Sequence, residues 1–301
     1  MGAIAVLVAG ILWGTTGLTA HYAPAGASPF AIGAGSMGLG GLVMALVGHA
    51  GAARRAPWRP IRTPLAWGVA CLTVYPMCFY GAMHYAGITV GTAINIGSAP
   101  LMAMAIERAT GRATFTRRKL GSAALAVLGL VLLSIGGAGH GGASTAENPP
   151  LGIALGLAAG LTYAGYSASA HEMIRRGCPS GIAMGRMFGV AGLFLVPFYL
   201  ATGGPLLTEP RGWAVMAYLA LVPMAFAYLL FGYGLRTTSA STAVTLTLVE
   251  PVVAAVLAVL VVKEEMGMLG WLGMALVLLG VLALGREGQP LPADEEAAAI
   301  P

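Results

Sequence analysis

The chain has 301 residues, of which 57% are hydrophobic and 9% are charged, and its mean hydropathy is +0.82. A soluble domain would be about one quarter charged, and several separate runs here reach the ~20 apolar residues that span a bilayer. This composition excludes a soluble globular domain and predicts a polytopic integral membrane protein. The net charge of +5 does not indicate nucleic-acid binding, because the basic residues fall in short loops between the apolar runs.

Hydropathy predicts ten membrane helices, so the expected fold class is all-α integral membrane. In chain order they cover 3–22, 29–49, 64–85, 88–107, 119–138, 151–172, 180–202, 212–235, 239–262 and 268–285. The first run, "MGAIAVLVAGILWG", has no basic residues before it, so we expect a membrane helix and not a signal peptide. The tail, residues 287–301, is acidic and rich in Pro and Ala and is predicted to be disordered.

Lysine and arginine predict the orientation, because they concentrate in cytoplasmic loops. With a cytoplasmic N-terminus, thirteen of the sixteen basic residues fall in cytoplasmic segments, and the outer loops hold only Arg211 and Lys263. The remaining one, Arg186, lies inside the seventh span. The bias predicts ten spans with both termini cytoplasmic; the expected location is a bacterial inner membrane.

The two halves of the chain resemble each other. "CFYGAMHYAGITVGTAINIGSAPLMAMAI" aligns with "LLFGYGLRTTSASTAVTLTLVEPVVAAVL", which places Gly81 on Gly232 and Pro100 on Pro251. The expected units are a first repeat at 1–140, a periplasmic linker at 141–150 and a second repeat at 151–286, before the cytoplasmic tail. Each repeat holds five spans, an odd number, so the second enters the membrane inverted. Inverted repeats are typical of transporters that expose one midplane site alternately to each side.

The closing segment "STAVTLTLVEPVVAAVLAVLVVKEEMGMLGWLGMALVLLGVLAL" resembles the end of an EamA domain, and "GILWGTTG" resembles its start. The chain thus resembles an EamA-type member of the drug/metabolite transporter superfamily along nearly its full length. The resemblance implies ten spans in two repeats and a secondary transporter, more often an exporter than an importer. The chain departs from the family pattern at Ala113, where a Glu is usual, and at Ser36, where an Arg is frequent; Arg186 keeps the basic residue at the paired position.

Glu250 and Pro251 lie near the middle of the ninth predicted span, about eleven residues from its start. A carboxylate there is unfavourable by ~2.5–3.5 kcal/mol unless it faces a polar interior or is protonated. Proline removes a backbone hydrogen bond and frees a carbonyl one turn earlier, which is tolerated where it faces protein or a wet cavity. Glu250 is therefore a candidate for proton binding or for pairing with a substrate amine, or it bonds a neighbouring helix. Pro100 and Pro251 are candidate hinges.

Six further side chains are candidates for lining a central cavity or for coupling. Asn95 and Ser98 lie on one polar stripe of the fourth span, and Tyr80 and His84 lie on one stripe of the third. Trp13 and Tyr163 are both mid-span and are related by the repeat. Each residue also has a structural interpretation, since aromatic rings pack, Asn95 can bond a neighbouring helix and His84 can belong to the interfacial belt.

A carboxylate, an amide, hydroxyls and aromatic rings together suit a neutral or aromatic amino acid, which is the expected substrate. Two alternatives remain: efflux of lipophilic cations paired with Glu250, and a membrane-embedded enzyme built on His171 and Glu172. "GAGSMG" at 33–38 fits a dinucleotide fingerprint but lacks the preceding strand. "HEMIRR" at 171–176 has Arg175 where a zinc-protease motif needs its second His. The sequence predicts no catalytic residue, metal site, cofactor or nucleic-acid partner; the expected partners are a small molecule, the lipid bilayer and protons, with no oligomeric state predicted.

Overall fold

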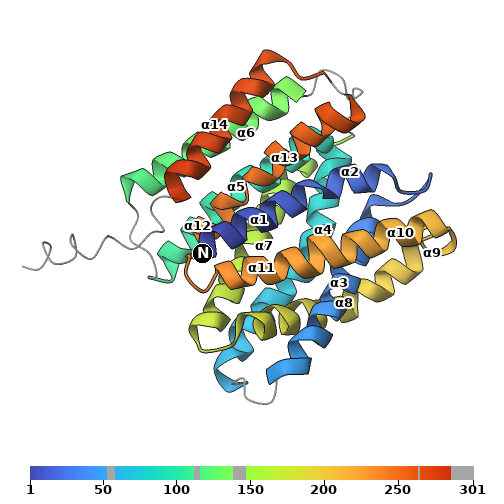
Figure 1. Cartoon of the computed structure of the whole chain (residues 1–301), viewed down its shortest axis with the longest axis vertical. Helices are drawn as coiled ribbons and strands as arrows, with labels where there is room; N and C mark the ends of the chain where they lie inside the picture. The colour runs from blue at the N-terminus through green and yellow to red at the C-terminus, as the bar shows by residue number, and fades with distance from the viewer. Residues whose placement is uncertain (53–57, 112–115, 138–146, 264, 286–301) are drawn as a thin grey trace, which may run out of the picture.

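The computed structural model describes residues 1–52, 58–111, 116–137, 147–263 and 265–285 (Figure 1). Within these ranges all regular secondary structure is helical. Residues 141–146 of the predicted linker, the tail 287–301, and Ala113 of the family comparison lie outside the described residues.

The described helices form ten apolar spans, as predicted. In the first half they are α1 (Gly2–Gly14) with α2 (Thr16–His21), α3 (Pro29–Ala52), α4 (Arg62–Ala86), α5 (Ile88–Ala109) and α6 (Arg117–Gly137). In the second half they are α7 (Pro149–Arg175), α8 (Ser180–Thr202), α10 (Pro210–Leu219) with η3 (Ala220–Phe226) and α11 (Ala227–Gly234), α12 (Ala240–Leu246) with α13 (Val249–Leu257) and η4 (Ala258–Val262), and α14 (Met268–Gly285). Nine of the spans reach bilayer length, and the tenth is the shorter apolar helix Met268–Leu284.

Contacts between loops and helix ends show that successive spans run in alternating directions. One end of the bundle holds the start of α1, and we call it the N-side; the opposite end is the far side. N-side contacts are Arg176 to the Pro60 carbonyl, His171 to the Leu235 carbonyl and Lys119 to Ser239. Far-side contacts are Asn148 to the Tyr85 carbonyl, Gly267 to the Gly136 carbonyl and Thr15 to Tyr218. This alternation is what two inverted five-span repeats require.

The packing partners of the spans also obey the repeat. The most extensive contacts pair α3 with α8, α6 with α14, α4 with α7 and α5 with α7; the contact of α1 with α11 follows, and α5 also touches α12. If the two repeats are exchanged, three pairs map onto themselves: α3–α8, α5–α12 and α6–α14. The α4–α7 pair maps onto the α11–α1 pair. Figure 1 shows α6 and α14 side by side at one edge of the bundle and α1 beside α11. The fold is therefore a pseudo-symmetric bundle in which each span packs against a span of the other repeat.

Small residues allow the closest of these contacts. Gly129 and Gly136 of α6 face Gly273 and Gly270 of α14, and a Cβ atom on Gly129, Gly136 or Gly273 would overlap backbone atoms of the opposite helix. Close approach through glycine is a common source of helix association in lipid, where burial of apolar surface gives no driving force.

Candidate functional site

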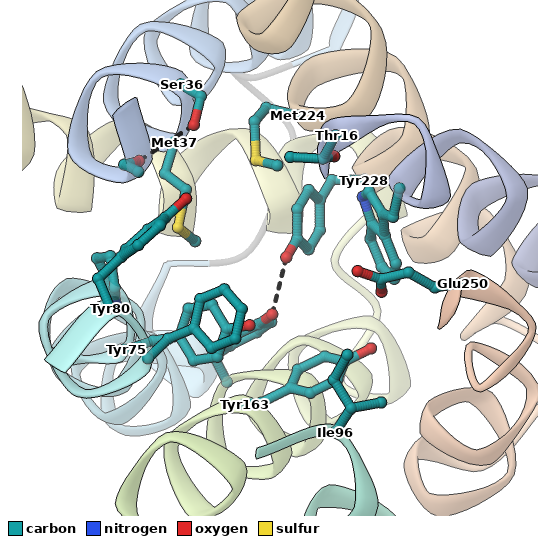
Figure 2. Close-up of a pocket in the computed structure, with 15 residues that line it drawn as sticks. Thr16, Ser36, Met37, Tyr75, Tyr80, Ile96, Tyr163, Met224, Tyr228 and Glu250 are labelled. Carbon is teal, nitrogen blue, oxygen red and sulfur yellow. Dashed lines mark hydrogen bonds between the residues drawn. The ribbon is translucent and has the colours of Figure 1, made fainter. Parts of the chain in front are cut away.

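A cavity near the middle of the bundle is lined by seven spans (Figure 2). Its empty space, counted together with the open mouth, is about 640 Å³. The first three spans contribute Trp13 and Thr16 of the first span, Ser36 and Met37 of α3, and Tyr75, Phe79 and Tyr80 of α4. The rest of the wall is formed largely by Ile96, Tyr163, Tyr166, Tyr228 and Glu250. The lining is thus mainly aromatic, with one carboxylate.

Glu250 reaches the cavity because the ninth span is interrupted just before it. Helix α12 ends at Leu246 and α13 begins at Val249, with a turn at Thr247 and Leu248 between them. Pro251 has no N–H to give to the Thr247 carbonyl four residues earlier. The Glu250 N–H donates to that carbonyl instead, at 2.9 Å, which tightens the turn. Glu250 therefore lies in the first turn of α13, where the helix dipole favours an acidic side chain.

The carboxylate of Glu250 extends into the cavity on the side opposite Tyr80 (Figure 2). Among the residues that the structure describes, no hydrogen bond or ion pair to this carboxylate is found. The described cavity lining also contains no Lys, Arg or His. A carboxylate held in a membrane span without a protein partner attracts a proton or a cationic ligand.

Hydrogen bonds fix the aromatic lining. The Trp13 indole donates to the Pro223 carbonyl at 2.7 Å, the Tyr166 and Tyr228 hydroxyls lie 2.8 Å apart, and the Tyr163 hydroxyl lies 2.9 Å from Thr247 Oγ1. The ring of Trp13 is 4.6 Å from that of Tyr228, centroid to centroid. Buried Trp and Tyr need such partners for their polar atoms. The rings therefore form a rigid wall whose faces can contact a cation or an apolar ligand.

Four of the predicted residues, Trp13, Tyr80, Tyr163 and Glu250, lie together in this cavity. A further predicted residue, Asn95, is fully buried beside the cavity. The Asn95 amide donates to the Tyr75 hydroxyl at 3.3 Å and holds that ring in place.

The other predicted positions lie away from the cavity or show a different backbone geometry. The Ser98 hydroxyl donates to the Asn95 carbonyl at 3.3 Å and packs against Gly160 of α7. His84 is exposed on the far side, 3.6 Å from Glu147. Pro100 lies inside α5, which continues past it without the interruption seen before Pro251.

Three cavity tyrosines, Tyr75, Tyr166 and Tyr228, were not predicted. Tyr166 follows Tyr163 by three residues and so lies on the same helical face, which is a signal that the sequence contained. Tyr75 stacks on Phe79 one turn later, with ring centroids 5.8 Å apart. Nothing in the local sequence of Tyr228 distinguishes it from an aromatic residue that packs between helices.

A second cleft continues from this cavity toward the far side. It shares Trp13, Thr16, Phe79, Tyr80, Ile96 and Glu250 with the cavity. Its other walls come from five spans, including Met83 of α4, Thr92 of α5, Ser134 of α6 and Ala254 of α13. Glu250 therefore lies where the cavity meets its path to the far side.

The residues considered for an enzyme have other contacts. His171 Nδ1 lies 3.0 Å from the Leu235 carbonyl, and Glu172 is bound by Arg175 at 2.9 Å and Arg176 at 2.6 Å. The His171 contact ties α7 to the segment that follows α11, and the Glu172 pairs lie within the C-terminal end of α7. In the described ranges, no group of three His, Cys, Asp or Glu side chains is placed to hold a metal ion. The "GAGSMG" run lies within helix α3, with no strand before it in the described chain.

Comparison with known proteins identifies the relatives of the chain. The EamA-like transporter family matches residues 1–135 and again 150–286. The chain belongs to this family. An uncharacterized transporter of Bacillus subtilis (strain 168), YwfM, is 32% identical over 280 residues, which cover 93% of this chain and 92% of that protein. An uncharacterized transporter of Archaeoglobus fulgidus is 29% identical over 136 residues, 45% of this chain and 48% of that protein.

One solved crystal structure has the same fold, with a TM-score of 0.74 over 96% of this chain and 99% of that chain, at 19% identity. Together with the described helices, the family match makes this chain a multi-pass membrane transporter with two five-helix repeats. The named relatives are described as transporters.

Proposed function

We propose that this protein is a secondary transporter that carries a small organic amine with an aromatic or apolar body, and that Glu250 is the counter-charge for the amine. The single observation that carries the proposal is the position of Glu250: a carboxylate without a partner among the described residues, in a cavity walled by aromatic rings. Carboxylate and ring faces together are the groups that recognise ammonium ions in proteins.

An amino acid, the substrate expected from the sequence, would also bring an amine to Glu250. Its carboxylate, however, would need a cationic or N–H partner, and the described lining supplies no cationic side chain. Ser36 stands in the wall at the position where the family often carries an Arg. The paired Arg186 lies over the ring of Trp58, 5.1 Å from its centroid, away from the cavity. We therefore rank an amine that lacks a carboxylate above the corresponding amino acid.

Proton coupling fits the same residue. Glu250 binds either a proton or an ammonium ion, and competition between the two would exchange one for the other across the membrane. The charge bias of the loops supports a cytoplasmic N-side in a bacterial cell, and the far-side cleft is then the outer path. Export is the direction that the family resemblance favours.

Counterflow in proteoliposomes tests the proposal. Vesicles loaded with unlabelled compound receive a trace of the same labelled compound outside, and protein-free vesicles correct for leak. Phenethylamine, phenylalanine and 3-phenylpropanoate share one aromatic ring and differ in charge; at pH 6 the amine is protonated and crosses lipid slowly. Labelled phenethylamine should accumulate fastest and phenylpropanoate should not accumulate. Faster exchange of phenylalanine would restore the amino acid as substrate, and exchange of the acid alone would refute a role for Glu250 as counter-charge.

A further inference from the structure

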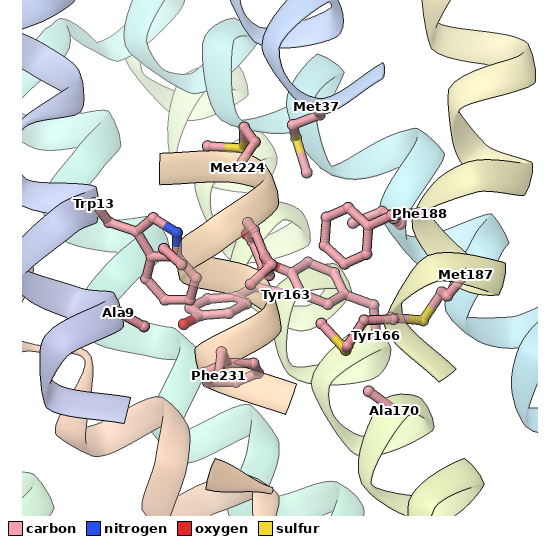
Figure 3. Close-up of a cluster of buried hydrophobic side chains, with 14 of the residues drawn as sticks. Ala9, Trp13, Met37, Tyr163, Tyr166, Ala170, Met187, Phe188, Met224 and Phe231 are labelled. Carbon is pink, nitrogen blue, oxygen red and sulfur yellow. The ribbon is translucent and has the colours of Figure 1, made fainter. Parts of the chain in front are cut away.

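The N-side half of the bundle is sealed beneath the cavity. Tyr163, Tyr166, Phe188 and Phe231 belong to one aromatic layer (Figure 3). Tyr228 completes the layer, with its ring 4.3 Å from that of Phe188 and 6.3 Å from that of Phe231. The hydroxyl bonds between Tyr166 and Tyr228 and between Tyr163 and Thr247 join α7 to the eighth and ninth spans. A substrate in the cavity therefore reaches the far side through the cleft, and the aromatic layer separates it from the N-side.

A cluster of polar side chains joins helices on the N-side of this aromatic layer. Glu107, at the end of α5, is 5% exposed and accepts hydrogen bonds from the backbone N–H and the hydroxyl of Ser241 in α12. Lys119 of α6 lies 3.6 Å from Glu107 and donates to the Ser239 hydroxyl at 3.0 Å. The cluster joins two helices of the first repeat to the first turn of α12 in the second repeat. Hydrogen bonds to a buried charge are among the stronger ones.

The fourth and ninth spans touch at this end, while the cleft separates them at the other. Helix α5 packs against α12 on the N-side. Toward the far side, Thr92 and Ile96 of α5 face Pro251 and Ala254 of α13 across the cleft. The two spans are related by the repeat. If each repeat adopted the conformation that the other has here, the far-side gap would close and α12 would separate from α5. Opening toward the N-side therefore requires the Glu107–Ser241 contacts to break.

Buried hydroxyls lie between the aromatic layer and this cluster. Ser167 and Thr245 are fully buried, and the Ser167 hydroxyl has no hydrogen-bond partner among the described residues. An unpaired buried hydroxyl is unfavourable in a permanently dry core. These side chains are suited to line a water-filled path when the N-side half opens.

We propose that Glu107, Lys119, Ser239 and Ser241 form the N-side gate of the transporter, a cluster that holds α5 to α12 while the cavity is open to the far side. The inference rests on the proposed alternating transport but not on the identity of the substrate. The repeat places Ala258 at the position equivalent to Glu107, so the far side has no matching carboxylate at this point. The gate therefore favours the N-side-closed state at rest.

Cysteine accessibility in lipid nanodiscs, where both faces meet the solvent, tests the gate. The native Cys71, Cys78 and Cys178 are replaced by Ala, and one reporter cysteine is placed at Ser167 or at Thr92. In Glu107→Gln, a membrane-impermeant maleimide should label the reporter at position 167 roughly tenfold faster than in the parent and the reporter at position 92 more slowly. Ser241→Ala should shift both rates in the same directions by a smaller factor, and Glu209→Gln, an exposed far-side control, should shift neither.

Two results would overturn the gate: unchanged labelling at 167 in both gate variants, or faster labelling at both reporters, which indicates general loosening of the fold. The substrate proposal is tested separately by counterflow. Reciprocal labelling without phenethylamine exchange would leave the gate in place and refute the substrate, whereas phenethylamine exchange with unmoved labelling would refute the gate.

Discussion

Replacing Glu250 by Gln removes the one charge of the described cavity lining and keeps the size of the side chain. Loss of one partner of a buried charge pair costs about 2–5 kcal/mol. Glu250 is half-buried and faces the cavity opening, so we take the lower part of that range, about 2–3 kcal/mol, which corresponds to a roughly 30- to 150-fold weaker Kd for phenethylamine. Phenylalanine should change by less than about threefold, because losing the amine contact is offset by removing the repulsion between its carboxylate and Glu250.

Isothermal titration calorimetry of the purified protein at pH 7 measures both affinities directly. The control is Glu209→Gln, which removes an exposed far-side carboxylate outside the cavity. An unchanged melting temperature would show that the Glu250→Gln variant is folded. Binding of phenethylamine within threefold of the wild type would refute the role of Glu250 as counter-charge and leave the carboxylate as a local structural feature.

Three further predictions concern topology and backbone. Cysteines replacing Arg59 and Glu147 should be labelled from opposite faces of sealed vesicles, since the two residues lie at opposite ends of the bundle; labelling from one face would contradict the span count. Pro251→Ala restores a helical N–H for the Thr247 carbonyl. Pro251→Ala and Pro100→Ala should each slow counterflow more than they weaken substrate binding; counterflow rates equal to that of the wild type would make both prolines packing features. Gly87 joins α4 to α5 with φ +89° and ψ 152°, so Gly87→Ala should lower stability by about 1–3 kcal/mol in thermal unfolding, and an unchanged Tm would show that the turn relaxes without strain.

The sequence was sufficient for the ten spans and their inverted order, because a bilayer requires long apolar runs and an odd repeat forces inversion. It also predicted that Glu250 faces a polar interior, since a carboxylate in mid-span needs polar surroundings, and Glu250 lines the cavity. It missed Tyr75, Tyr166 and Tyr228, because an aromatic residue in an apolar span has the same local pattern whether it packs or lines a cavity. The difference arises from the juxtaposition of seven spans, which hydropathy does not contain.

Two predicted candidates show how a helical stripe can mislead. His84 continues the stripe that contains Tyr80, but α4 ends two residues later at Ala86, so its side chain lies at the far-side surface. Ser98 continues the stripe of Asn95, but the helix turns it toward Gly160 of α7. His84 is kept from the cavity by its position along the helix, and Ser98 by the direction in which the helix turns its side chain.

The most direct test of the central claim is a crystal structure with 4-bromophenethylamine bound, in which anomalous scattering locates the bromine. The ring should lie among Tyr75, Phe79 and Tyr80, with the amine within about 3 Å of the Glu250 carboxylate, the length of a charge-assisted hydrogen bond. Bromine density at any other site, with the cavity free of ligand, would contradict the assignment of Glu250 and its aromatic wall as the substrate site.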